Sequence, residues 1–140
     1  MRFSTVLAVG LLAVSQAALA ASQDPRREKI LADYAAAAKA ANPGFAAFSA
    51  ERGRAIYLGP HQANAEIPAC AACHTNDPRQ TGRHVKTGRP IDPMAASAKP
   101  ARFTDVAEVE KRFGRDCKSV LGRDCTALDK GDFLTFLISQ

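Results

Sequence analysis

The sequence contains no tryptophan and only two tyrosines, and beyond its first 20 residues it has no long apolar run. A membrane-spanning helix needs about 18 or more consecutive apolar residues, so we expect no transmembrane span. A formal net charge of only +5 and the shortage of aromatic side chains argue against nucleic-acid binding. An apolar fraction of 46% indicates a small globular protein rather than a disordered one.

The first 20 residues have the three parts of a secretory signal peptide. Arg2 supplies the positive start, residues 6–14 form a short apolar stretch, and Ala18-Leu19-Ala20 resembles a cleavage site. We therefore expect export from the cytoplasm and removal of residues 1–20. The rest of the chain is expected to form a helical extension at residues 21–46 and one main domain at residues 47–140.

Two of the four cysteines lie in the sequence Cys70-Ala71-Ala72-Cys73-His74. Cys-x-x-Cys-His is the attachment motif for c-type haem. Thiols three residues apart reach the two vinyl groups on one porphyrin edge, and the next residue presents its imidazole to the iron. The motif predicts one covalent haem c, held by thioethers from Cys70 and Cys73, with His74 as the proximal iron ligand. Such haem is attached outside the bacterial cytoplasm, so we expect a periplasmic protein.

Other uses of the cysteines remain open. All four, including Cys117 and Cys125, have side chains suited to a zinc site. Cys70 and Cys73 alone could form a disulfide, as cysteines of exported proteins often do. They could also form a thioredoxin-like redox motif, although no βαβ pattern surrounds them.

Helix signals near the N-terminus predict two helices. Asp24 and Pro25 are a cap and a first-turn proline, and this helix is expected to end near residue 41. Ser49 is the expected cap of a second helix that ends near residue 58. Gly53 and Tyr57 lie four residues apart on one face of it, where the glycine allows another helix to approach closely.

The second half of the chain predicts a long loop followed by two helices. Residues 77–101 contain so many prolines and glycines that no long helix or strand is expected there, and we expect this loop to wrap the haem. A helix capped near Asp105 is expected to end at Gly114. A capping box of Thr126 and Asp129 begins the last helix, whose expected apolar face is formed by Leu128, Phe133, Leu134, Phe136 and Leu137.

The glycine–aromatic pair, the haem motif and the closing helix together resemble class I cytochromes c. A narrower resemblance covers roughly residues 28–140 and is to the sphaeroides haem protein family, which consists of high-spin monohaem cytochromes c that bind oxygen. The segments that carry it lie at residues 50–54, 87–91, 102–111 and 114–126.

The resemblance implies an all-α protein with the class I cytochrome c fold, an extra N-terminal helix and long loops around one covalent haem. It implies a disulfide between Cys117 and Cys125, and a distal iron ligand at Asp116, where the family usually has asparagine. It also implies that the protein binds O2 or NO in the ferrous state. We expect a monomer, and because no second catalytic group lies at a persuasive spacing from the haem motif, we do not expect an enzyme. Its electron donors would be a dihaem cytochrome c and a membrane cytochrome b.

The distal side of the iron is less well determined by the residues themselves. Asp116 has three interpretations: an iron ligand, a polar group beside an open iron, or a surface acid. Met94 is the one methionine outside the signal peptide, and we expect it to pack against the haem edge. As an iron ligand instead, it would make the chain a conventional electron-transfer cytochrome. His61 and His84 are expected to be solvated. A run of basic residues after the motif could attract an acidic partner; they are Arg79, Arg83, Lys86 and Arg89.

Overall fold

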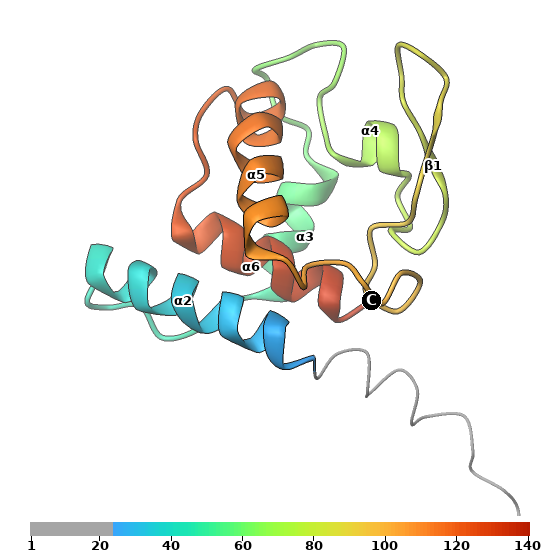
Figure 1. Cartoon of the computed structure of the whole chain (residues 1–140). Helices are drawn as coiled ribbons and strands as arrows, with labels where there is room; N and C mark the ends of the chain where they lie inside the picture. The colour runs from blue at the N-terminus through green and yellow to red at the C-terminus, as the bar shows by residue number, and fades with distance from the viewer. Residues whose placement is uncertain (1–23) are drawn as a thin grey trace, which may run out of the picture.

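The computed structural model describes residues 24–140. The expected signal peptide, residues 1–20, lies outside the described residues. Helices predominate, with a pair of two-residue strands between them (Figure 1). Among residues 24–140, no helix is long and apolar enough to cross a membrane. In chain order, the elements are α2 (Pro25–Ala41), α3 (Ala50–Leu58), α4 (Ala71–His74), β1 (Gly82–Arg83), β2 (Pro90–Ile91), α5 (Val106–Leu121) and α6 (Ala127–Ile138).

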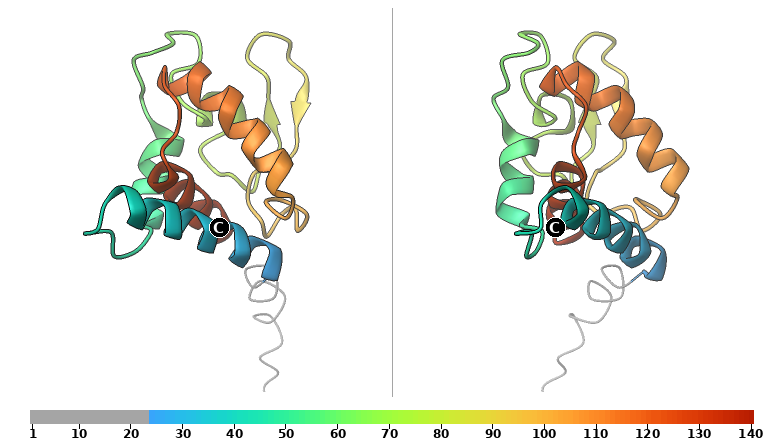
Figure 2. Two further views of the ribbon diagram at one scale, coloured as in Figure 1. Left: turned by 60° about the vertical axis from the view of Figure 1, so that its left-hand side comes forward. Right: turned by 90° about the vertical axis from the view of Figure 1, so that its left-hand side faces the viewer.

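Helix α2 begins and ends where the sequence predicts. The Asp24 side chain accepts a hydrogen bond from the Arg26 amide, and Pro25 occupies the first turn. Ile30 and Tyr34 are buried in the core, and the helix lies beneath α6 in the three views (Figures 1 and 2). The Tyr34 hydroxyl also donates to Glu110 of α5, so the N-terminal helix contacts both later helices.

Helices α3 and α6 cross at Gly53, as predicted. A Cβ atom added at Gly53 would lie 2.0 Å from the carbonyl oxygen of Asp132, so only glycine allows this approach. Beside the crossing, the buried Asp132 carboxylate accepts hydrogen bonds from the Arg52 side chain and from the Ser49 amide. Tyr57 is fully buried against Phe136, with the ring centroids 5.5 Å apart.

The predicted end of the third helix is wrong. Helix α5 continues through Gly114 to Leu121 and ends at Gly122, which has the left-handed φ of 69°. Nothing lies within 4 Å of the position a Cβ would take at Gly114, so this glycine is an ordinary exposed helical residue. As a result, Asp116 lies inside a helix rather than after its end.

The other expectations for the second half of the chain largely hold. Residues 77–101 contain only the antiparallel pair of β1 and β2, in which Gly82 faces Ile91. The capping box of Thr126 and Asp129 is present at the start of α6. Leu128 departs from the prediction: it is 37% exposed because it lies in the first turn, outside the buried face formed by Phe133, Leu134, Phe136 and Leu137.

Candidate haem site

A cavity of about 700 Å³ lies between α5 and the segments that carry the haem motif, residues 70–74. Figure 1 shows α5 opposite α4 and β1, on two sides of this region. The volume falls within the roughly 300–1,000 Å³ of cofactor and ligand sites. Its walls combine the motif, the loop before α5 and one face of α5, and they include His74, Met94, Arg102, Val109, Phe113 and Asp116.

The three chemically reactive residues of the motif line the cavity together. Cys70, Cys73 and His74 lie within or beside the short helix α4, and both cysteines are free thiols rather than a disulfide. Burial, with a smaller effect from the charge of Asp116, raises the pKa of Cys70 to about 12. Two unpaired thiols facing an apolar cavity fit the attachment of a porphyrin edge.

The His74 imidazole has the state that an iron ligand requires. Burial, followed by the positive charge of Arg102, lowers its pKa to about 4, so the ring is neutral at pH 7. Its Nδ1 atom is buried and has no hydrogen-bond partner among residues 24–140. A partly buried, neutral imidazole on the wall of a cofactor-sized cavity is suited to bind haem iron.

The end of α4 is held by Tyr57. The Tyr57 hydroxyl donates to the carbonyl oxygens of His74 and Thr75, at 3.0 and 2.8 Å. This contact is not predicted from the sequence, in which the spacing of Tyr57 from Gly53 indicates only the helix crossing. The one signal in the sequence is the hydroxyl group of Tyr57. A buried tyrosine hydroxyl needs a hydrogen-bond partner, which a purely apolar helix contact does not supply.

Strand β1 packs directly against the motif. A Cβ at Gly82 would lie 2.2 Å from the carbonyl oxygen of Cys73, so this glycine lets the loop after the motif pass close to its backbone.

The zinc alternative is contradicted by the arrangement of the cysteines. Cys117 is joined to Cys125 by a disulfide, with their Cα atoms 5.7 Å apart, so neither sulfur is available to a metal. Over residues 24–140, no group of three or more His, Cys, Asp and Glu side chains is placed to hold a metal ion. The two cysteine pairs therefore have separate roles.

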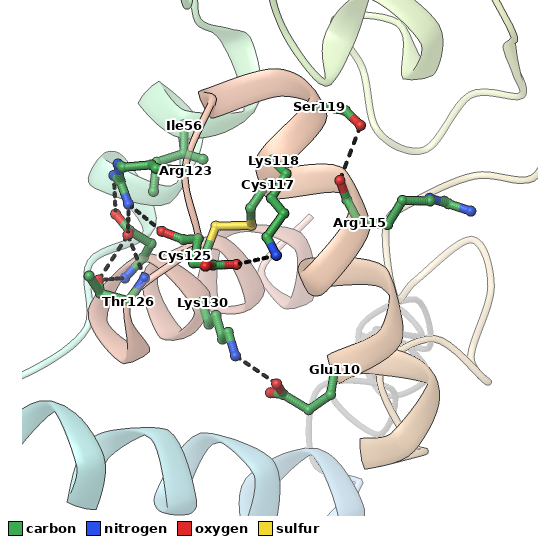
Figure 3. Close-up of a disulfide and its surroundings, with 12 residues drawn as sticks. Ile56, Glu110, Arg115, Cys117, Lys118, Ser119, Arg123, Cys125, Thr126 and Lys130 are labelled. Atoms are coloured by element: carbon green, nitrogen blue, oxygen red, sulfur yellow. Dashed lines mark hydrogen bonds and ion pairs between the residues drawn. A yellow bond between two sulfur atoms is a disulfide. The ribbon is translucent and has the colours of Figure 1, made fainter. Parts of the chain in front are cut away.

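The disulfide ties α5 to the segment that precedes α6 (Figure 3). Cys117 lies in the last part of α5, where its side chain is buried with Phe113 and Val120. The ion pair between Lys118 and Asp124 spans the same two segments at 3.4 Å. The cross-link thus restrains the part of α5 that carries Asp116.

Asp116 faces the cavity from α5. Its carboxylate accepts two hydrogen bonds from the neighbouring Arg115, at 2.6 Å from Nε and 3.2 Å from Nη2. Its charge also acts on the two motif residues on the other side of the cavity, where it adds to the effect of burial in raising the pKa of Cys70 and opposes burial at His74. The fold therefore brings Asp116 and the motif to one cavity.

Met94 also lines the cavity, but from the segment that follows the motif. Its backbone amide donates to the carbonyl of Pro78 at 2.8 Å, only four residues after His74. The side chain is partly buried against the core. The Met94 backbone is therefore fixed beside the segment that follows His74, whereas Asp116 lies on α5, on the other side of the cavity.

The two remaining histidines differ from one another. The Nε2 atom of His61 lies 2.7 Å from the carbonyl oxygen of Ile56, and within residues 24–140 His61 is not among the residues that line the cavity. His84 does line the cavity, and its Nδ1 accepts from the amides of Lys86 and Thr87. Both histidines are half-buried, so each is less exposed to solvent than expected.

Comparison with known proteins places the chain in a family. Residues 43–137 match the family model described as "Domain of unknown function (DUF1924)". The chain is 42% identical over 131 residues to the cytochrome c-type protein SHP of Cereibacter sphaeroides, covering 93% of this chain and 96% of that protein. It is 33% identical over 141 residues to cytochrome c'' of Methylophilus methylotrophus, covering 100% of this chain and 96% of the relative.

The fold agrees with these sequence relationships. The solved structure of oxidized SHP, described as an oxygen-binding cytochrome c, superposes with a TM-score of 0.74 at 43% identity, covering 81% of this chain and 96% of that one. The all-α cytochrome c fold expected from the sequence is thus confirmed. With the cavity, the haem motif and these relatives in agreement, the chain belongs to the DUF1924 family and to the SHP family of c-type cytochromes.

Proposed function

We propose that this protein is a periplasmic monohaem cytochrome c that is redox-active and binds a small diatomic ligand, O2 or NO, in its reduced state. Cys70 and Cys73 would form the thioethers and His74 the proximal iron bond. The bound haem would supply an iron that changes oxidation state and a distal coordination position. The observation that carries the proposal is the single cavity shared by the haem motif and the Asp116 face of α5.

Asp116 is the proposed distal residue. It comes from the element opposite the motif, and the disulfide at Cys117 restrains its position. A carboxylate is a hard anion and prefers ferric to ferrous iron. Asp116 would therefore hold the distal position less firmly after reduction, which leaves room for an external ligand. The oxygen binding described for the relative SHP supports this proposal.

A conventional electron-transfer cytochrome is the second candidate, because Met94 also lines the cavity. A thioether ligand would stabilise ferrous iron and leave no distal position free. The backbone bond of Met94 to Pro78 argues against it, since that bond ties Met94 to the segment just after His74. We therefore assign Met94 to packing against the haem edge.

A dihaem cytochrome c and a membrane cytochrome b are the proposed electron donors, as the family resemblance implies. The basic run after the motif offers a place for an acidic partner to dock. Arg79 pairs locally with Asp77, and Lys86 pairs with Glu66. Both cationic side chains remain more than half exposed, so they could attract an acidic surface at a distance.

The test is a set of absorption spectra on the wild type, Asp116→Ala and Met94→Ala, after a pyridine haemochrome assay has measured covalent haem. We expect one haem per chain, an altered ferric spectrum in Asp116→Ala and an unchanged one in Met94→Ala. The opposite pattern, with the spectrum altered only by Met94→Ala, would favour the electron-transfer cytochrome. Absence of covalent haem would contradict both.

A further inference from the structure

Arg115 and Asp116 form one compact ion pair on the wall of the cavity. The guanidinium uses two different nitrogens, and each reaches a different oxygen of the same carboxylate. Both residues line the cavity. Figure 3 shows Arg115 extending from α5 on the side away from the disulfide. Both carboxylate oxygens of Asp116 are thus engaged by a side chain from the same turn of α5.

No other cation shares this carboxylate within the described part of the chain. Arg112, one turn earlier, pairs with Glu108 at 2.6 Å. Lys118, two residues later, pairs with Asp124 outside the cavity. The bonds from Arg115 are the only side-chain bonds that Asp116 makes among residues 24–140. Within the described part of the chain, Arg115 is therefore the one side chain in direct contact with this carboxylate.

The pairing changes what Asp116 offers to the cavity. A lone carboxylate would bring a full negative charge to a site lined largely by apolar side chains such as Val109 and Phe113. Because Arg115 donates to both oxygens, the ion pair is neutral overall, and some of the lone pairs of the Asp116 carboxylate already accept hydrogen bonds. An iron ligand would have to compete with the guanidinium for the same oxygens.

We propose that Arg115 is a positioning residue that weakens and directs Asp116 as a distal group, so that external ligands can displace it. This inference rests on the proposed function, because it requires a haem whose distal side faces Asp116. It assigns to Arg115 a role in ligand affinity rather than in folding. Without Arg115, Asp116 would occupy the distal position more firmly.

The test measures imidazole binding to the ferric holoprotein by absorption titration. Imidazole is uncharged at pH 8, above its own pKa. Removing the Arg115 charge therefore does not alter the Coulomb attraction between imidazole and the site. We expect Arg115→Gln to weaken imidazole binding by about three- to fivefold, in the range expected for an exposed ion pair whose side chains are 62% and 48% exposed. The midpoint potential should fall in the same variant, because firmer carboxylate ligation favours the ferric state.

Two comparisons separate this role from a general charge effect. Lys118→Gln removes one positive charge from the same helix but outside the cavity, and it should leave imidazole affinity and potential unchanged. In an Asp116→Asn background, Arg115→Gln should also have no effect, because a neutral amide leaves no ion pair to break. An equal weakening in both backgrounds, or in Lys118→Gln, would overturn the proposal.

The experiment also separates the proposed distal role of Asp116 from the proposed role of Arg115. If Asp116→Asn and Asp116→Ala both leave the ferric spectrum and the imidazole affinity unchanged, the distal role of Asp116 fails, and the role of Arg115 fails with it. If those two variants change the spectrum and Arg115→Gln does not change the affinity, the proposed function stands and only the role of Arg115 is refuted.

Discussion

The two helical glycines Gly53 and Gly114 should respond in opposite directions to the same substitution by alanine. At Gly53 the new Cβ would lie 2.0 Å from the Asp132 carbonyl oxygen and 2.9 Å from the Cβ of Phe136. The first contact is with backbone, so it cannot be relieved by a side-chain rotation. Helices α3 and α6 would have to separate by about 1 Å to restore an ordinary contact.

We expect Gly53→Ala to lower the free energy of unfolding by about 3 kcal/mol, at the upper end of overpacking costs. At Gly114 no atom lies within 4 Å of the new Cβ, and the position is inside α5. Gly114→Ala should therefore raise the free energy of unfolding by about 0.5–1 kcal/mol, since alanine is the better helix former.

Urea unfolding of both variants and the wild type, followed by far-UV circular dichroism at equal haem content, measures the two effects. The pair also tests the continuation of α5 through Gly114. If Gly114→Ala destabilises the protein, this residue does not have ordinary helical geometry. If Gly53→Ala costs less than about 1 kcal/mol, the close approach of α3 and α6 is refuted.

Two further predictions concern the cross-link and the last helix. Replacing both Cys117 and Cys125 by alanine should lower the free energy of unfolding by about 2.5 kcal/mol from loop entropy at a separation of 8 residues, and an unchanged urea midpoint would contradict this. Burial alone would raise the pKa of Asp129. Hydrogen bonds from Arg123 and Thr126 outweigh burial and hold this pKa below its ordinary value of 3.8. Its stabilisation is therefore complete above pH 3.8 and is lost as the pH falls through the lower folded value. Asp129→Asn should be less stable than wild type at pH 7 and should approach it in acid. A difference that persists in acid unfolding curves would argue against this assignment.

Local signals explain why most helix boundaries could be predicted from the sequence. Caps such as Asp24, Ser49 and the Thr126–Asp129 box satisfy free backbone groups through neighbours only two or three residues away. Such bonds depend on adjacent residues alone, so sequence reasoning finds them. The helix end predicted at Gly114 was wrong because a glycine ends a helix only where the backbone turns left-handed. The backbone does so at Gly122, and the residue type alone does not distinguish the two glycines.

The site was only partly predictable for a different reason. The haem motif is contiguous, so its residues could be named directly. The Tyr57 bond to the end of α4 spans 17 residues, and it forms only once α3 and α4 are in place. The pairing of Arg115 with Asp116 depended on knowing that both lie inside α5 rather than beyond its end.

The most direct test of the account is the absorption spectrum of the reduced wild-type protein before and after addition of carbon monoxide. A haem held by Cys70, Cys73 and His74, with a weakly occupied distal side, should bind one carbon monoxide per haem and change its spectrum fully at low ligand concentration. A reduced spectrum that does not respond to carbon monoxide, together with the long-wavelength sulfur–iron band in the oxidised protein, would contradict the account and indicate Met94 ligation.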